Sequence, residues 1–432
     1  MKDYLEKTGR SVSRAEENRL AKGCVGVKQT TGQHPGGLII IPRGKEITDF
    51  CPAQHPADDK DKGTITLHFE YKYIEDNLIK LDILGHENPT MLRMLEGMTG
   101  INADDIRLDD SDTMEIFSSP LILGLPEDDK IIGETGSIGI PEFGTPFTRR
   151  MLSDTRPENF DTLIRLSGFS HGTGVWAGNA KDLIFEGKAT IAETISSRED
   201  IILFLVSKGM DERYAFKISE SLRKGYNLPD GSEAEMLRYN IPTWYIESCK
   251  KVTYLFPKAH AVAYIMMAFR IAWFKVHKPL EFYSAHFYRR RKSFDVEIMT
   301  RGIEKVRSKI NEIQSSQEQK SSKKDEDLLT TLESCYEFYK RGFDFDGIDL
   351  YDSDSEKFLI SGENKLRPPF ITVNGLGEAA ALSLAENRKD RRFISIDEIS
   401  AECPGVNKTN LDKLKQLGAL RDLPDSGQMS LF

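Results

Sequence analysis

Two apolar runs near the beginning of the chain predict β-strands. The first is Gly37-Leu38-Ile39-Ile40-Ile41, a continuous apolar run that Pro42 stops. The second lies within the segment from Asn77 to Gly85, where apolar and polar residues alternate. Runs of this length with β-branched residues, bounded by Gly and Pro, are typical of strands. Residues 1–90 therefore read as mixed α/β.

The second predicted strand carries an unusual charge. Successive side chains on a strand point to opposite faces, so Ile79, Leu81 and Ile83 share one face, which we expect to be part of the core. Lys80 and Asp82 share the other face. Aspartate is depleted in strands, and a buried carboxylate needs a cation or a metal as partner. Asp82 therefore either pairs with Lys80 or serves as a ligand for Mg²⁺, which binds carboxylate oxygens.

The rest of the chain is mostly helical in pattern. Residues 89–290 have helical spacing, interrupted by loops at 118–146 and 168–180 that are rich in Gly, Pro, Ser and Thr. Residues 315–327 are polar and predict an exposed loop, and residues 328–342 predict an amphipathic helix. Residues 369–422 carry two similar helical hairpin patterns. The fold class is therefore mixed α/β and predominantly α-helical.

Length and composition indicate a soluble protein of two to four domains. The chain has 432 residues, of which 39% are hydrophobic and 29% charged. It contains no run of about 18 apolar residues and no apolar segment after Met1, so we expect neither a membrane span nor a signal peptide. The five cysteines lie far apart, which is typical of a reduced cytoplasm. The net charge of -9 argues only weakly against nucleic acid, because binding follows local basic clusters.

The segment from Leu78 to His86 resembles the third catalytic aspartate motif of PolC-type bacterial DNA polymerase III alpha subunits. The resemblance implies that Asp82 is one of three palm carboxylates that hold two Mg²⁺ ions for attack of the primer 3′-hydroxyl on a dNTP. The family's other two carboxylates come from an upstream D-x-D pair. We reject Asp344/Asp346 and Asp352/Asp354 as that pair, because both lie after Asp82 in polar, loop-like sequence. We therefore expect the chain to begin inside the palm, without the family's exonuclease, and to be inactive alone.

The upstream run from Thr30 to Gly37, with Gln33 and His34, also resembles the family's palm sequence. Two later segments resemble its fingers: residues 138–150, which include Arg149 and Arg150, and residues 167–180, which include His171. A Gly-rich loop leading into a helix offers backbone N–H groups to a triphosphate, although such loops are also common helix caps. One departure is Gly174, where an Asp commonly precedes the Val-Trp pair in the family.

The segment from Phe256 to Lys275 predicts a helix with Pro257 in its first turn. Lys258 lies at the end that favours an anion, and His260 and Tyr264 are four residues apart, so both lie on one face. These two rings are either packing residues or nucleotide contacts. The K-x-H-x-x-x-Y arrangement resembles the nucleotide-binding helix of bacterial polymerase III alpha subunits, which favours dNTP contact. Arg149, Arg150, Lys181 and Arg270 are further candidate phosphate ligands, and His171 is a further candidate for nucleotide binding.

Residues 369–380 read as a helix-hairpin-helix, in which Gly375 and Gly377 let backbone amides approach a DNA phosphate. A Gly-x-Gly turn before a helix also ends many ordinary loops. A degenerate second copy runs through Gly405, Asn407 and Lys408, and we expect Asn407 to keep the turn because asparagine tolerates positive φ.

The last five residues, Gln428 to Phe432, place two large apolar side chains at an expected flexible terminus, which indicates a docking peptide. They resemble the bacterial sliding-clamp consensus, with Gln428 as polar anchor and Leu431 and Phe432 as the apolar pair.

The resemblance covers the whole chain and implies four parts: the C-terminal part of a nucleotidyltransferase-like palm (1–88), helical fingers (89–290), a helix-hairpin-helix duplex-binding domain (291–424) and a clamp-binding tail (425–432). It implies a cytoplasmic DNA-directed DNA polymerase that acts in chromosome replication with Mg²⁺, dNTPs, primer-template DNA, a sliding clamp and other replisome subunits, and with no membrane. Two alternatives remain: a DnaE-type alpha subunit, for which we would expect a further C-terminal domain, and a non-catalytic, clamp-tethered DNA-binding protein.

Overall fold

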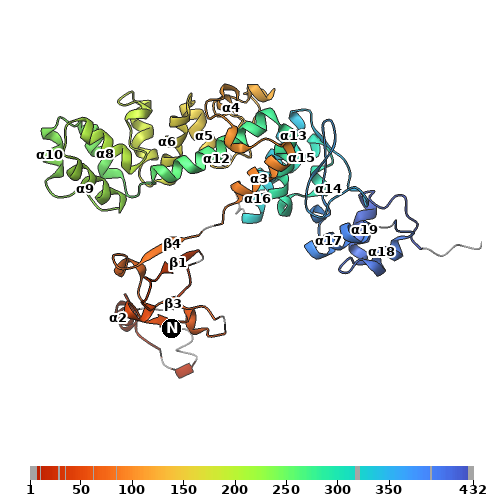
Figure 1. Ribbon diagram of the computed structural model, residues 1–432, viewed down its shortest axis with the longest axis horizontal. Coiled ribbons are helices and arrows are strands. Elements are labelled where there is room, and N and C mark those ends of the chain that lie inside the picture. The colour runs from red at the N-terminus through yellow and green to blue at the C-terminus, as the bar shows by residue number, and fades with distance from the viewer. Residues whose placement is uncertain are drawn as a thin grey trace, which may run out of the picture. The chain divides into compact units, whose positions relative to one another are not determined.

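The computed structural model describes residues 7–9, 11–27, 30–34, 36–61, 63–83, 85–316, 322–389 and 392–426. The chain divides between His86 and Glu87 into two units, each with its own internal contacts. The first unit, in red and orange in Figure 1, contains the strands and little helix. The second unit is predominantly helical, so the described chain as a whole is mixed α/β and mostly α-helical, as the sequence predicts.

Among the described residues, the main elements of the first unit are a helix and two separate strand pairs. Helix α2 spans Arg14–Gly23. Strand β1 (Gly37–Ile40) pairs antiparallel with β4 (Ile79–Asp82), and β2 (Ala53–Gln54) pairs antiparallel with β3 (Thr66–Leu67). Among its described apolar side chains, the buried ones are Cys51, Ile74 and Leu78. A core of this size buries little apolar surface, so local hydrogen bonds supply much of the order in this unit.

The second unit begins with helices that pack around a continuous apolar core. They follow in this chain order: α3 (Glu87–Thr99), α4 (Ser111–Glu115), α5 (Pro146–Thr155), α6 (Phe160–His171), α7 (Lys181–Phe185), α8 (Arg198–Ser207), α9 (Glu212–Arg223), α10 (Ser232–Arg238), α11 (Thr243–Lys251), α12 (Lys258–His277), α13 (Pro279–Arg289), α14 (Val296–Met299), α15 (Ile303–Ser316) and α16 (Lys323–Lys340). Helix α12 runs through this group, and α3, α4, α6 and α13 all pack on it (Figure 1).

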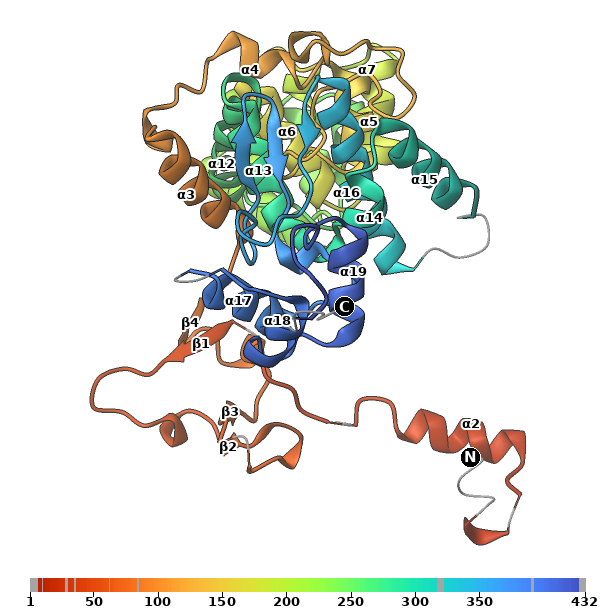
Figure 2. The ribbon, with the colours of Figure 1, turned by 90° about the vertical axis from the view of Figure 1, so that its right-hand side faces the viewer.

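A small sheet and three further helices complete the second unit. Strand β7 (Lys365–Arg367) lies between β5 (Asp344–Phe345), to which it is parallel, and β6 (Leu359–Gly362), to which it is antiparallel. Helices α17 (Glu378–Asn387), α18 (Ile396–Glu402) and α19 (Lys408–Gln416) gather in one cluster, drawn in blue (Figures 1 and 2).

Helix α12 is the central helix of the core. Its buried residues include Ile265, Phe269, Ile271 and Phe274. Among the described residues it is the helix that is long and apolar enough to cross a membrane by length and composition alone. A core helix of a large domain passes the same test, and the contacts of α12 with its neighbours explain its apolar character here.

A charged pair is buried where α12, α13 and α16 meet. The Lys275 ammonium lies 2.7 Å from Glu337 Oε1, and both side chains are fully buried. Lys275 also donates to the carbonyl oxygens of Gly136 and Ile138, at 2.7 Å each, and Tyr283 donates to Glu337 Oε1 at 2.6 Å. The network satisfies both charges and fastens the loop before α5 to the helical core.

Several predicted boundaries differ in the structure. The expected loop at 315–327 is shorter, because α15 continues to Ser316 and α16 starts at Lys323. The start of α16 is fixed by a capping box: Ser322 Oγ accepts from the Asp325 N–H and Asp325 Oδ2 accepts from the Ser322 N–H, at 3.2 Å each. The second strand is also shorter than the predicted segment from Asn77 to Gly85. It covers only Ile79–Asp82, the residues that pair with β1.

Candidate nucleotide and nucleic-acid sites

In the first unit, two polar side chains, Lys80 and His34, lie close to Asp82. Gly37 on β1 faces Asp82 on β4 across the pair. Lys80 Nζ lies 3.2 Å from Asp82 Oδ1, and His34 Nδ1 lies 4.0 Å from the same oxygen. A Cβ at position 37 would come within 2.9 Å of His34 Nδ1, so glycine is what leaves room for the imidazole. The polar face predicted for this strand is therefore present, with His34 added to it.

The opposite face of the β1–β4 pair is apolar and exposed. Leu38 pairs with Leu81, and Ile40 pairs with Ile79, so these four side chains share that face. Ile79 is 67% exposed and Leu81 is 47% exposed, which corrects the expectation that this face belongs to a core. The physical reason is that a two-stranded sheet supplies no second layer, and no described element of this unit covers the face.

The described residues do not fit a magnesium site. Among them there is no group of three or more His, Cys, Asp or Glu side chains placed to hold a metal ion. Asp82 offers one carboxylate, and its nearest charged neighbour is the Lys80 ammonium. The two later D-x-D pairs serve other roles: Asp346 pairs with Lys365 at 3.2 Å, and Asp354 accepts the Glu356 N–H at 2.8 Å.

In the second unit, Lys258 starts α12 inside a cluster of charges. Its ammonium lies 3.4 Å from Asp200 Oδ1 and 4.0 Å from Asp161 Oδ1, and its side chain is 24% exposed. Burial raises the pKa of the Asp200 carboxyl, but the charges of Arg165 and Lys258 and the Ser196 hydroxyl outweigh it and hold the pKa below the ordinary value. An arriving phosphate would therefore compete with Asp200 for this ammonium.

Four aromatic rings near the start of α12 contact one another in a row. The His171 ring lies flat against Phe256, with 4.7 Å between centroids. Phe256 meets His260 edge to face at 5.2 Å, and His260 meets Tyr264 at 4.4 Å. We call these four residues the aromatic ladder. His171 and His260 are exposed, and Phe256 and Tyr264 are half-buried, so the ladder is a surface that can receive a planar group.

Glu142 anchors one end of the aromatic ladder. Its Oε2 lies 2.7 Å from His171 Nε2, and its side chain is only 14% exposed. Neither Glu142 nor Phe256 was assigned a role from the sequence. Phe256 precedes His260 by four residues, and His260 precedes Tyr264 by four, so the spacing in the sequence already indicates that the three rings are neighbours. The Glu142–His171 contact joins residues 29 apart and had no such signal.

Most of the additional predicted phosphate ligands are engaged elsewhere. Arg149 is largely buried and binds Glu333 at 3.3 Å and the backbone carbonyls of Ile131 and Ile132. Its guanidinium holds the loop before α5, so a phosphate could bind Arg149 only by replacing these contacts. Lys181 pairs with Asp154 at 2.6 Å. Arg270 pairs with Asp104 at 2.8 Å, and Arg150 is exposed on α5.

The expected Gly-rich loop at 168–180 is partly helical, because α6 continues to His171. Gly174 has φ +74°, and a Cβ there would lie 2.0 Å from the Lys251 carbonyl oxygen. Glycine at this position is therefore required by the packing of this chain. Asn179 fixes the rest of the loop: its amide donates to the Gly174 and Ser248 carbonyls at 2.7 and 3.1 Å.

The two hairpins before α17 and α19 have matching backbones. Gly375 and Gly405 both have φ +85°, and in each turn the following N–H bonds back three residues. Gly377 and Asn407 take the equivalent N-cap position, and Asn407 has φ −100°. The expectation that Asn407 adopts positive φ is therefore wrong: the second turn survives because its left-handed residue is Gly405. The first hairpin begins with a 3-10 turn at Phe370–Thr372 rather than a full helix.

The two hairpins also pack on each other. Asn410, in the first turn of α19, donates to the Gly375 carbonyl at 3.0 Å, and Gly405 lies against Ala380 in the first turn of α17. At the start of α19, Lys408 is exposed, a favourable charge for a phosphate. At the start of α17, Glu378 takes the same position and pairs with Lys292 at 2.9 Å. The hairpins therefore differ in charge although their geometry is alike.

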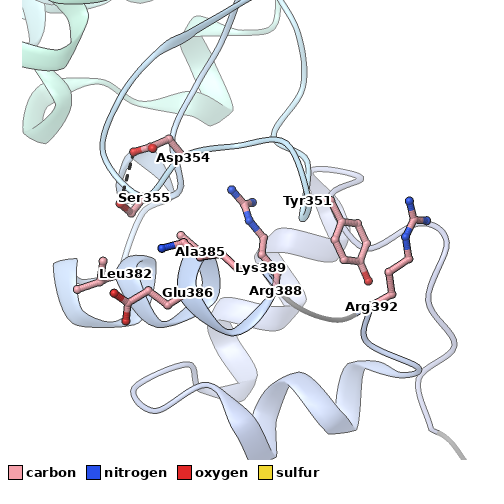
Figure 3. A pocket seen from close by; sticks show the side chains of 9 residues that line it. All are labelled: Tyr351, Asp354, Ser355, Leu382, Ala385, Glu386, Arg388, Lys389 and Arg392. Carbon is pink, nitrogen blue, oxygen red and sulfur yellow. Dashed lines mark hydrogen bonds between the residues drawn. The ribbon is translucent and has the colours of Figure 1, made fainter. Parts of the chain in front are cut away.

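A cavity of about 590 Å³ lies beside α17 and carries basic side chains (Figure 3). Arg388 donates to the Leu350 carbonyl and lies over the Phe370 ring at 5.1 Å, and burial lowers the pKa of its guanidinium. Arg392 lies over the Tyr351 ring at 5.2 Å. These contacts with ring faces and backbone show that both arginines stabilise the hairpin domain.

A larger cavity of about 900 Å³ is lined by a basic turn, Arg289 to Lys292, and by Asn374 at the first hairpin. Burial, and then the charge of Arg289, lower the pKa of the Arg290 guanidinium. The four side chains of the turn pair with carboxylates, in order Glu87, Asp327, Glu356 and Glu378. The three arginines are only 20–25% exposed, whereas Lys292 and Glu378 are both exposed. Exposed pairs are weak, so Lys292 can exchange Glu378 for a phosphate.

Three family models match the chain. The bacterial DNA polymerase III alpha NTPase domain matches residues 3–85, the bacterial DNA polymerase III alpha subunit finger domain matches residues 88–237, and a helix-hairpin-helix motif matches residues 342–428. The aromatic ladder thus joins His171, inside the finger match, to residues that follow it.

Curated relatives are similar over the entire chain. The chain is 48% identical over 432 residues to DNA polymerase III PolC-type of Caldanaerobacter subterraneus subsp. tengcongensis, and covers 30% of that protein. It is 48% identical to the protein of the same name from Bacillus cereus and 47% identical to that from Thermotoga maritima, of which it covers 30% and 31%. The chain therefore spans about a third of the length of these relatives.

Proposed function

The chain belongs to the PolC-type bacterial DNA polymerase III alpha subunits, and from this membership and the geometry above we propose that it binds the incoming dNTP and the DNA duplex in DNA-templated DNA synthesis during chromosome replication. One observation carries the nucleotide part of the proposal. His171 forms one row of rings with Phe256, His260 and Tyr264, although it comes from a segment almost 90 residues earlier than His260.

Two features near the start of α12 suit a nucleoside triphosphate. The aromatic ladder offers ring faces for a planar base, and base–aromatic stacking contributes about 1–3 kcal/mol per base. Lys258 at the start of α12 supplies a positive charge where the helix end already favours anions. We propose that the triphosphate takes over the ammonium from Asp200, and that Asp200 holds Lys258 in place until then.

Asp82 is proposed as the carboxylate that this chain contributes to the chemistry. In the family a magnesium site polarises the reacting phosphate, and it takes more than one carboxylate. The described residues do not supply that set, so no catalytic step is assigned to this chain by itself. We propose that the remaining carboxylates come from the part of the longer relatives that this chain does not cover.

Duplex binding is proposed for the paired hairpins. The start of α17 has no side-chain cap, so its N–H groups remain available, and Lys408 offers a charge at the start of α19. Such contacts bind the backbone without reading sequence, so affinity should fall steeply with salt. The clamp-binding residues Gln428, Leu431 and Phe432 lie outside the described residues, and docking to a sliding clamp in a cytoplasmic replisome remains a proposal from the sequence.

One alternative is a non-catalytic, clamp-tethered DNA-binding protein, which the paired hairpins would also suit. The two functions differ in nucleotide affinity. We expect the 432-residue chain with primer-template DNA to bind a dNTP, and Lys258→Ala and His260→Ala each to weaken binding about tenfold or more. Isothermal titration of dTTP measures this. Duplex binding without any dTTP binding would support the alternative.

Deletion of Gln428 to Phe432 tests the clamp proposal separately. In a full-length polymerase of this family we expect the deletion to shorten the products made per binding event with the clamp present. Addition of a single nucleotide should not change, because the peptide is remote in sequence from the proposed nucleotide surface. Unchanged product lengths would refute a clamp-binding role for these residues.

A further inference from the structure

Glu142 has a backbone conformation that costs free energy. Its φ is +67°, in the left-handed region that a residue with a side chain rarely adopts. Two glycines nearby, Gly139 and Gly133, also have positive φ but have no side chain to clash. A strained non-glycine residue persists where the surroundings hold it and often where its side chain has a function.

The surroundings of Glu142 hold it firmly. Ser137 Oγ donates to the Phe143 carbonyl at 3.0 Å, which closes the loop around position 142. Lys275 holds the same loop from inside the core through the Gly136 and Ile138 carbonyls. These buried contacts therefore restrain the loop and hold the Glu142 carboxylate in one position at the surface.

The partner of Glu142 is not part of the core. The His171 side chain is 44% exposed, and its ring rests on Phe256, which is itself half-buried. An ion pair between side chains at the surface adds little stability. The small stability of a surface ion pair does not account for the strained backbone at Glu142 or for the buried lysine that holds its loop. These features point instead to a role for Glu142 in holding the His171 ring.

We propose that Glu142 is a positioning residue for nucleotide binding, which fixes the His171 imidazole flat on Phe256 so that its free edge meets a phosphate of the incoming dNTP. The inference rests on the proposed function, since it assigns a use to the aromatic ladder. Nε2 contacts Glu142, so the ligand would meet Nδ1, which donates to a phosphate when the imidazole is protonated at both nitrogens. Without the carboxylate, the ring is free to turn about its side-chain bonds, and binding loses a preorganised contact.

The test compares Glu142→Ala, Glu142→Gln and a control, Glu127→Ala, in the full chain with primer-template DNA. Glu127 is exposed and lies outside the proposed site. We expect dTTP to bind about tenfold more weakly to Glu142→Ala, and Glu142→Gln to restore most of the affinity because its amide oxygen still accepts from Nε2. The control should bind as the parent chain does.

A second measurement isolates the orientation. Imidazole ¹⁵N spectra should show the His171 Nε2 resonance displaced in Glu142→Ala and near its parent position in Glu142→Gln, while circular dichroism stays unchanged. Unchanged dTTP affinity in Glu142→Ala, with Lys258→Ala still weakening binding, would overturn the positioning role and leave the nucleotide site standing. Absence of dTTP binding to the parent chain would overturn both. An unmoved His171 resonance would overturn the role of Glu142 alone.

Discussion

Replacing Lys275 with methionine tests the buried network that joins the loop before α5 to the core. Methionine keeps the length of the side chain and removes the ammonium, which donates to two backbone carbonyls and to Glu337. Glu337 would keep Tyr283 as a donor but lose its counter-charge. Removing one partner of a buried ion pair costs about 3–5 kcal/mol, so we expect the free energy of unfolding to fall by that amount.

The assay can use an intrinsic probe. Trp273 precedes Lys275 by two residues on α12 and packs against the His277 ring at 4.6 Å, so its fluorescence should report urea unfolding of this region. Glu337→Gln and the double variant complete a cycle. The double variant should lose less stability than the two single losses added together, by about 1–3 kcal/mol, because the second change removes a partner already isolated. A loss below about 1 kcal/mol for Lys275→Met would refute the reasoning.

The Lys275→Met variant also tests how stability depends on pH. Burial lowers the pKa of the Lys275 ammonium to about 8, from its ordinary value of 10.5. Between about pH 8 and pH 10.5 the unfolded chain holds this proton more than the folded chain, so the contribution of Lys275 to stability rises with pH. The difference in unfolding free energy between the parent and Lys275→Met should therefore grow by up to about 3 kcal/mol across this window. A difference that stays flat would contradict the lowered pKa.

Further changes test the other sites. Gly174→Ala places a Cβ 2.0 Å from a backbone oxygen, and we expect a loss of about 1–3 kcal/mol in thermal unfolding; an unchanged midpoint would show that the loop yields. Gly405→Ala forces φ +85° on alanine and should weaken duplex binding for all sequences alike in fluorescence anisotropy, unless this hairpin does not meet DNA. Leu81→Ser should change the stability of this chain by less than about 0.5 kcal/mol, and a loss above 2 would mean that its exposed face is covered. Asp82→Ala in a full-length polymerase should abolish primer extension but spare duplex binding, and retained extension would refute its proposed role.

Local patterns in the sequence were sufficient for the helix that begins at Lys258. Pro257 and the four-residue spacing of His260 and Tyr264 gave its start and the face that carries both rings, because helical periodicity is a property of nearby residues. The same holds for the hairpin glycines, whose turn needs one residue with positive φ wherever it occurs. The start of α16 was missed although Ser322 and Asp325 have the spacing of a capping box.

Charges were harder to assign, because an arginine in a sequence has no partner until the chain folds. Arg149 resembled a phosphate ligand, and the fold uses it to bind Glu333, which is 184 residues away. The face of Ile79 and Leu81 was assigned to a core because both residues are apolar. The sequence pattern shows which side chains share a face of the strand, but it does not show whether another element covers that face.

The sequence by itself determined the helical class, the hairpin turns, the polar and apolar sides of the strand that carries Asp82, and the family. Tertiary structure alone decided which side chains meet: His171 with Phe256 and Glu142, Lys258 with Asp200, and Lys275 with Glu337. The physical reason is the distance along the chain over which each effect acts. Backbone propensity and side-chain periodicity act over a few residues, whereas contacts between distant segments exist only after packing has brought those segments together.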